Sequence, residues 1–365
     1  MGKTNVPPNA ADWQSDNPLF GRTGNPWNLD RVPGGSSGGA AAAVAAGLTP
    51  LEYGSDIGGS IRFPAAWCGV YGHRPSSTAI PDAGHFPGSP LPNPTLQLNT
   101  LGPIARTAAD LALGVKVVAG PDIGDEVAWR LELPAPRHER LSDYRVAIYP
   151  GADWRPVSSE ITGAIEKLAA NLRKAGAHVA LAQPDGFEDG GRDHNEVFVS
   201  IAGAIQGSRL SDEERAARRE LLLASGDPFA EMRARHLEAS AAAYMALHGR
   251  REQYRARWRA FFRDWDVMLA PIVMVPAPPH STLPPDVRAA EFDGQTVSYR
   301  SQSAYSGLSI MSGVPATAFP IGMSRDGLPI SIQAIGPYLE DYTPIRFAGL
   351  VGSEIGGYQR PPGYD

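Results

Sequence analysis

The chain has a single cysteine, Cys68, among its 365 residues. One thiol cannot form an internal disulfide or a cysteine-based metal cluster, and its place in an apolar run is typical of a small buried side chain. Positive charge is also scarce, because 33 Lys and Arg residues against 39 Asp and Glu residues give a net charge of −6. This balance provides neither the basic surface that nucleic acids need nor an attraction to anionic membranes. We therefore expect no nucleic-acid partner and no membrane partner.

Long hydrophobic runs are missing as well. The apolar stretches at residues 40–47 and 267–275 are far shorter than the roughly 20 residues that a membrane span requires. The N-terminus shows no charged segment followed by an apolar one, as a secretory signal would. We expect a cytoplasmic protein.

What is present indicates a large α/β fold. Hydrophobic residues make up 42% of the chain and charged residues 20%, which suits a globular protein with a sizeable core. Residues 144–149 and 178–181 resemble strands, and residues 158–176 between them carry apolar residues at helical spacing. This strand–helix–strand order indicates a partly parallel sheet. We predict one domain over residues 1–365, with a single large mixed β-sheet flanked by helices and no independent second domain.

Capping signals place further helices. Thr107 with Asp110 predicts a helix start that continues to about Ala119, and residues 211–214 (SDEE) form a second capping box. Glycine and proline predict helix breaks near residues 226–228 and at Gly249. Aromatic residues then recur at intervals of three or four, which indicates core packing rather than a cofactor site: Tyr254, Trp258, Phe261 and Trp265.

Two glycine/serine motifs require more than a structural explanation: GGSSGG at residues 34–39 and SDIGGSIR at residues 55–62. Flexible linkers have a similar composition, but each motif is short and adjoins an apolar segment. Ser36 and Ser37 followed by Gly38 predict a turn that caps a buried helix. The glycines of the second motif allow backbone N–H groups to converge on an anion. That anion is either a phosphate or the oxyanion formed when a serine attacks a carbonyl, and two ordinary turns remain the alternative.

Together the motifs resemble the amidase signature family. The family pattern is G-G-S-S-G-G followed by G-[ST]-D-x-G-G-S-I-R-x-P-A, and here Ser36 and Ser60 keep its spacing of 24 residues. Residues 11–15 (ADWQS) are similar to the branch that contains cyclic-dimer hydrolases of nylon oligomers. Nearly the whole chain is covered, through GKTN (2–5), NPWN (25–28), GVYGHRPS (69–76, with Arg74 where Lys is more usual), GPIAR (102–106) and GLP (327–329).

The resemblance implies the amidase signature fold and a Ser–cis-Ser–Lys mechanism. Ser60 would be the nucleophile, and Ser36, after a cis peptide bond to Gly35, would relay protons. The oxyanion hole would consist of the backbone N–H groups of Ile57, Gly58, Gly59 and Ser60. The loop would be braced by Ser37, Asp56 and Arg62.

The implied activity is hydrolysis of a carboxamide through an acyl-enzyme on Ser60. No cofactor and no metal are expected, and the partner would be a small-molecule amide, with a homodimer left open. Residues 1–120 would hold the catalytic motifs, and the helical and loop-rich residues 185–300 would line a substrate funnel.

Lysine is the scarcest charged residue, and it departs from the family pattern. The chain has four: Lys3, Lys116, Lys167 and Lys174. In the family, the base is a buried neutral lysine. It precedes the bridging serine by more residues than this chain has before Ser36, which are only 35. Lys3 matches the later GKTN position. We expect a truncated or mis-started amidase because the serine motif is intact, and the alternative is a short inactive homologue that binds amides without turnover.

Other interpretations are weaker. Gly-Lys-Thr at residues 2–4 lacks the upstream glycine and strand of a phosphate-binding loop. A histidine-based hydrolase would need a G-x-S-x-G turn, and the nearest histidines, His73 and His85, are expected to be core or surface residues. An acidic cluster is expected to be a solvated loop rather than a metal site: Glu188, Asp189, Asp193 and His194.

Overall fold

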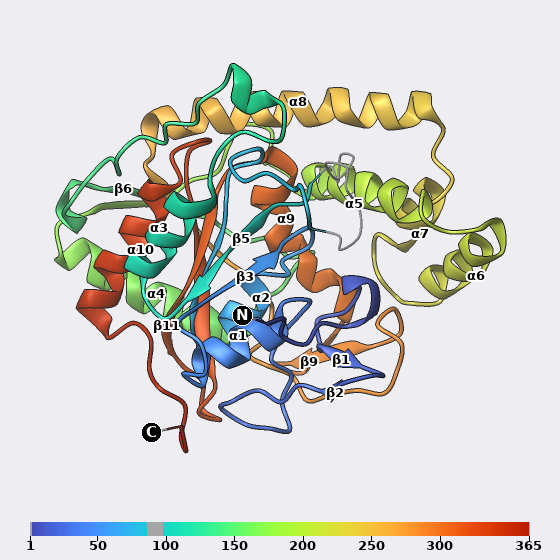
Figure 1. Ribbon diagram of the computed structural model, residues 1–365, viewed down its shortest axis with the longest axis horizontal. Helices are drawn as coiled ribbons and strands as arrows, with labels where there is room; N and C mark the ends of the chain where they lie inside the picture. The colour runs from blue at the N-terminus through green and yellow to red at the C-terminus, as the bar shows by residue number, and fades with distance from the viewer. Residues whose placement is uncertain (1, 86–97, 365) are drawn as a thin grey trace.

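An eight-stranded mixed sheet crosses the molecule (Figure 1). The computed structural model describes residues 2–85 and 98–364. In spatial order the strands are β3 (Leu51–Ser55), β5 (Leu101–Ala105), β4 (Tyr71–Arg74), β11 (Ala316–Met323), β12 (Pro329–Ile335), β8 (Val267–Pro271), β6 (Arg145–Ile148) and β7 (His178–Leu181). Neighbours are antiparallel except for β8, β6 and β7, which run parallel. The predicted mixed sheet is confirmed.

Helices cover both faces of this sheet. One face carries α3 (Ala108–Val118), α4 (Ser159–Lys174) and α10 (Tyr342–Ile355). The other carries α1 (Gly38–Ala45), α2 (Arg62–Cys68), α5 (Arg192–Gly207), α8 (Ala241–Asp264) and α9 (Ser303–Ser312). Strand β12 shows the alternation that produces the two cores, because Ile332 and Ala334 pack under α10 while Ile335 packs with α8 and α9.

The smaller elements lie outside the sheet. Helices α6 (Asp212–Leu223) and α7 (Ala230–His236) extend from α5, away from the strands (Figure 1). Two hairpins are formed by β1 (Asp16–Asn17) with β2 (Gly21–Arg22) and by β9 (Ala289–Phe292) with β10 (Gln295–Ser298). The 3₁₀ turns are η1 (Pro8–Ala10), η2 (Asp125–Val127), η3 (Leu141–Asp143) and η4 (Tyr299–Gln302). No helix in the described part of the chain has the length and apolarity to cross a membrane.

The predicted caps are present. The Thr107 side chain accepts a hydrogen bond from the Asp110 N–H at the start of α3, and Ser211 with Glu214 forms the reciprocal capping box of α6. Strands β6 and β7 pair in parallel through α4 as the strand–helix–strand pattern predicted. These features depend on residues within a few positions of each other, which is why sequence pattern alone identifies them.

Two local predictions are wrong. Helix α8 continues through Gly249 without a break; one interior glycine costs only about 1 kcal/mol, and packing of Tyr254 and Trp258 into the core outweighs this. Ser37 occupies the N-cap position of α1, but its side chain makes no capping hydrogen bond. The Ser15 hydroxyl takes that place and accepts from the Gly38 N–H at 3.0 Å.

Candidate active site

The two glycine/serine motifs lie against each other at one end of the sheet. Ser60 is in the loop between β3 and α2, and the Ser37 N–H donates to the Ser60 carbonyl at 3.2 Å. The peptide bond between Gly35 and Ser36 is cis, as expected. Ser36 is only 2% exposed and Ser60 only 5%. The fold therefore brings the two predicted serines to one shielded place.

Glycine is required where the first motif meets its neighbours. A Cβ on Gly35 would lie 2.4 Å from the Asp12 carbonyl oxygen and 2.7 Å from Trp13 Cα. Gly34 has a φ of +91°, and a Cβ there would lie 2.4 Å from Pro64 Cα. Since real Cβ atoms do not approach backbone this closely, these glycines allow residues 12–13 and α2 to pack directly on the motif.

Asp56 holds the serine loop in shape. Its buried carboxylate accepts from the Gly59 N–H at 2.8 Å, the Ile61 N–H at 3.3 Å and two Arg62 nitrogens at 3.0 Å each. Burial alone would raise the pKa of this carboxyl group. The charge and hydrogen bonds of Arg62, the charge of Arg74 and the Gly59 N–H outweigh burial and lower the pKa. Asp56 is therefore an ionised acceptor at neutral pH.

Arg62 extends this network to the rest of the molecule. Its Nη1 donates to the Ser306 carbonyl at 3.1 Å, Ser309 Oγ at 2.8 Å and Gln333 Oε1 at 2.6 Å. The side chain is fully buried. One ion pair thus ties the Ser60 loop to α9 and β12.

The backbone N–H groups expected to form the oxyanion hole differ from expectation at one position, Gly59. The N–H of Gly59 is engaged by Asp56 and is not available to an oxyanion. Gly59 serves the turn instead, because its φ is +100° and a Cβ would lie 2.6 Å from the Phe63 ring. Within residues 2–85 and 98–364, the N–H groups of Ile57, Gly58 and Ser60 have no hydrogen-bond partner.

A cluster that sequence reasoning missed borders the first motif. The Asp12 carboxylate accepts two bonds from Arg288 Nη1 at 2.8 Å and one from the Tyr299 hydroxyl at 3.2 Å. The Trp13 ring lies 4.8 Å from that of Phe63 and 5.0 Å from that of Tyr299, between centroids. The resemblance drew attention to residues 11–15, but no pattern in the sequence pointed to their distant partners.

Gln302 was also missed. This residue follows Tyr299 in η4 and directly precedes α9, and it is fully buried. Neither its Oε1 nor its Nε2 has a hydrogen-bond partner among the described residues. Leaving a buried polar group unpaired costs about 1–3 kcal/mol. Its amide therefore has unused hydrogen-bonding capacity beside η4 and α9.

The lysines do not provide a base at this site. All four lysine side chains are exposed, and Lys116, Lys167 and Lys174 lie on α3 and α4. A lysine stays neutral near pH 7 only when it is buried or next to another cation. None of the four has the buried environment that the expected base requires.

His73 is equally unsuited to activate Ser60. It is buried on β4, with Nδ1 2.9 Å from Thr317 Oγ1 and Nε2 3.1 Å from Asp341 Oδ1. Both ring nitrogens are occupied, so this histidine joins β4 to β11 and to the start of α10. His85 is partly buried.

The buried thiol of Cys68 donates to the Pro33 carbonyl at 3.3 Å, as expected of a core cysteine.

The acidic cluster is not a solvated loop throughout. Asp193 and His194 lie in the first turn of α5, and His194 is 2% exposed. Asp193 forms an ion pair with Arg250 and accepts from the Tyr254 hydroxyl at 2.5 Å. In the described part of the chain no group of three or more His, Cys, Asp or Glu side chains could hold a metal ion.

His194 gives a pH-dependent prediction. Burial, with the charge of Arg155, lowers the pKa of His194 to about 3 from 6.5. The unfolded chain takes up a proton below pH 6.5 while the folded chain does not, so the free energy of unfolding should fall as pH decreases from 6.5. The slope from this group is about 1.4 kcal/mol per pH unit. Urea unfolding from pH 4 to 8 should show that His194→Phe removes this slope, and parallel curves for the two proteins would contradict it.

Comparison with known proteins agrees with this geometry. The family model described as Amidase matches residues 1–344. A glutamyl-tRNA(Gln) amidotransferase subunit of Synechococcus sp. (strain CC9902) is 32% identical over 95% of this chain and 72% of its own length. Indoleacetamide hydrolase of Bradyrhizobium diazoefficiens is 29% identical over 93% of this chain and 62% of its own. The structure of 6-aminohexanoate cyclic dimer hydrolase complexed with substrate is similar with a TM-score of 0.75 and 25% identity, over 100% of this chain and 77% of that one.

Proposed function

Since this chain belongs to the amidase family and hydrolyses carboxamide bonds, we propose that cleavage proceeds through an acyl-enzyme on the Ser60 hydroxyl. The observation that carries the proposal is the contact between the two motifs, where Ser37 N–H donates to the Ser60 carbonyl beside the cis bond before Ser36. The substrate is a small-molecule amide.

In the first half-reaction, Ser60 Oγ attacks the amide carbon and gives its proton to Ser36 Oγ, while the Ser36 hydroxyl gives its own proton to the amide nitrogen. The C–N bond then breaks, and the amine leaves with the proton that it received from Ser36. A serine hydroxyl is too weak a nucleophile without a base; in the family this base is a lysine, and none of the four lysines here takes that role. Water then attacks the ester on Ser60, which releases the carboxylic acid and restores the hydroxyl.

The negative charge that develops on the carbonyl oxygen needs backbone donors. The N–H groups of Ile57, Gly58 and Ser60 are unpaired in the described structure, so we assign the oxyanion hole to them and leave out Gly59. A single donor of this kind contributes about 10²–10³ in rate. Asp56 supports the hole indirectly, because its bond to Gly59 N–H fixes the turn.

The substrate side of the site extends beyond the motifs. We infer that residues 185–300 line the route to Ser60, since Arg288 and Tyr299 contact Asp12 beside the first motif. The unpaired amide of Gln302 would bond a polar group of the substrate. One amidase domain over residues 1–365 accords with the sheet, whose strands come from Leu51 through Ile335.

Trapping the acyl-enzyme tests the proposal. Incubation with a chromogenic anilide and hydroxylamine should yield a hydroxamate, because a bound acyl group transfers to the stronger nucleophile. Rapid acid quenching and peptide mass spectrometry should place the acyl mass on the peptide that contains Ser60. Aniline release with no acylated Ser60 and no hydroxamate would contradict the mechanism, as would failure to release an aniline from any anilide tested.

A further inference from the structure

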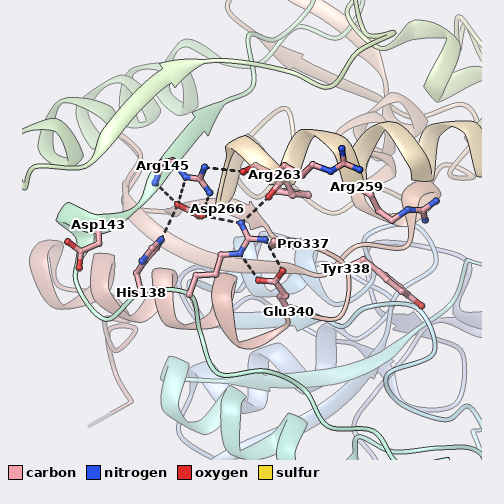
Figure 2. Close-up of a pocket in the computed structure, with 11 residues that line it drawn as sticks. His138, Asp143, Arg145, Arg259, Arg263, Asp266, Pro337, Tyr338 and Glu340 are labelled. Atoms are coloured by element: carbon pink, nitrogen blue, oxygen red, sulfur yellow. Dashed lines mark hydrogen bonds and ion pairs between the residues drawn. The ribbon is translucent and has the colours of Figure 1, made fainter.

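A cavity lies away from the serine motifs. Its volume is about 620 Å³, and it is bordered by the C-terminal end of α8, the segment before and at the start of β6, and residues 337–340 after β12 (Figure 2). None of the residues assigned to the amidase reaction lines it. A volume of this size is typical of small-molecule sites.

The floor of the cavity is a balanced ion-pair network. The Asp266 carboxylate, with only 1% of its side chain exposed, accepts from Arg145 Nη2 at 2.7 Å and Arg137 Nη1 at 3.1 Å. Arg137 also bonds both oxygens of Glu340, at 2.6 and 2.8 Å. Burial would raise the pKa of Asp266, but hydrogen bonds from Arg145 and Arg137 lower it to about 2. Two arginines are thus neutralised by two carboxylates.

The same two arginines satisfy the end of helix α8. Arg137 Nη1 donates to the carbonyls of Phe262 and Trp265 at 3.0 and 3.1 Å, and Arg145 Nη1 donates to the Arg263 carbonyl at 3.0 Å. The last carbonyls of a helix need such donors. No further cation is required to cap α8.

Two more guanidinium groups nevertheless line the cavity. Arg259 and Arg263 are one helical turn apart on α8, so their side chains lie on the same face, and Figure 2 places both on the α8 wall. Both residues are exposed, and neither side chain forms a hydrogen bond or ion pair with any described residue. The remaining lining carboxylate, Asp143, is bound by Arg140 at 3.1 and 3.2 Å. The Glu252 carboxylate is bonded by Arg255 at 2.8 Å and interacts with Arg259 only through its charge. Neither Arg259 nor Arg263 therefore has a hydrogen-bonded carboxylate partner among the described residues.

We propose that this cavity binds a phosphate monoester of a small organic molecule, with Arg259 and Arg263 on the phosphate dianion. Paired guanidinium groups match the charge and the bidentate geometry of phosphate oxygens. Pro337 and Tyr338 also line the cavity and supply apolar surface for the organic part. The Arg255 guanidinium lies over the Tyr338 ring, 5.5 Å from its centroid. The Tyr338 hydroxyl is engaged by the Ser77 carbonyl at 3.1 Å, so its ring is held in position.

Calorimetric titration with phenyl phosphate at fixed ionic strength tests this site. We expect saturable one-to-one binding that is weakened about tenfold or more by each of Arg259→Gln and Arg263→Gln. Inorganic phosphate should bind more weakly than the ester, and benzoate more weakly still. Arg219→Gln is the matched control, since it removes an exposed arginine from helix α6, and it should leave the affinity unchanged.

Three outcomes would overturn the proposal: no saturable binding of phenyl phosphate, equal weakening by Arg219→Gln, or full affinity in the double variant Arg259→Gln/Arg263→Gln. Thermal unfolding of each variant checks the fold, which should be retained because both side chains are exposed. Covalent labelling of Ser60 should not change in these variants, so the result is independent of the amidase mechanism.

Discussion

Ser60→Ala is expected to abolish covalent labelling by a fluorophosphonate and to reduce amide hydrolysis by about 10⁴-fold or more. The substitution removes only the attacking oxygen. The Ser60 carbonyl still accepts from the Ser37 N–H, and Asp56 still fixes the loop through Gly59 and Arg62, so the fold should be unchanged. Gel-based labelling and hydrolysis of an anilide measure the two effects, and circular dichroism checks the fold.

Ser312→Ala is the matched control for this result. Ser312 is another buried serine, and its hydroxyl donates only to carbonyls of its own helix α9. Labelling and turnover should persist in that variant. Undiminished labelling of Ser60→Ala would assign the nucleophile to a different residue.

Asp56→Asn is expected to lower the free energy of unfolding by about 3–5 kcal/mol, because it leaves a buried cation without its partner. Arg62 and Asp56 are both fully buried, and Arg74 Nε lies 3.9 Å from the same carboxylate. The amide keeps the size of the side chain but removes its charge, so the loss reports electrostatics rather than a cavity. Urea unfolding at pH 7 measures it.

The pH dependence of stability at acidic pH gives an independent check on the role of Asp56. Because its pKa is lowered in the folded chain, its stabilising effect is present above the ordinary value of 3.8 and is lost as pH falls through the lower folded value. The two proteins should therefore converge in stability at strongly acidic pH. Asp326→Asn is the surface control, since its bond to Arg31 is 3.3 Å long with 71% of the aspartate side chain exposed, and it should cost less than about 1 kcal/mol. Equal losses in the two variants would refute the proposed role of Asp56.

Sequence by itself determined the features that depend on near neighbours. The caps at Thr107 and Ser211 and the parallel pair β6–β7 follow from spacing and polarity within short windows. The serine motifs could also be identified from the sequence, because their glycines permit backbone geometry that other residues cannot adopt. Family and reaction class followed from these short stretches.

Only the tertiary structure decided which groups are already occupied and which remain available. The Gly59 N–H donates a hydrogen bond to Asp56. The sequence shows that residue 59 is a glycine but not whether its N–H already has an acceptor. The Asp12–Arg288 pair joins residues 276 positions apart, and Arg259 and Arg263 became a candidate site only when Arg137 and Arg145 were seen to complete the helix end beneath them. Such contacts join chain segments that meet only after folding. They therefore leave no periodic pattern of residues within a short stretch of sequence from which they could be predicted.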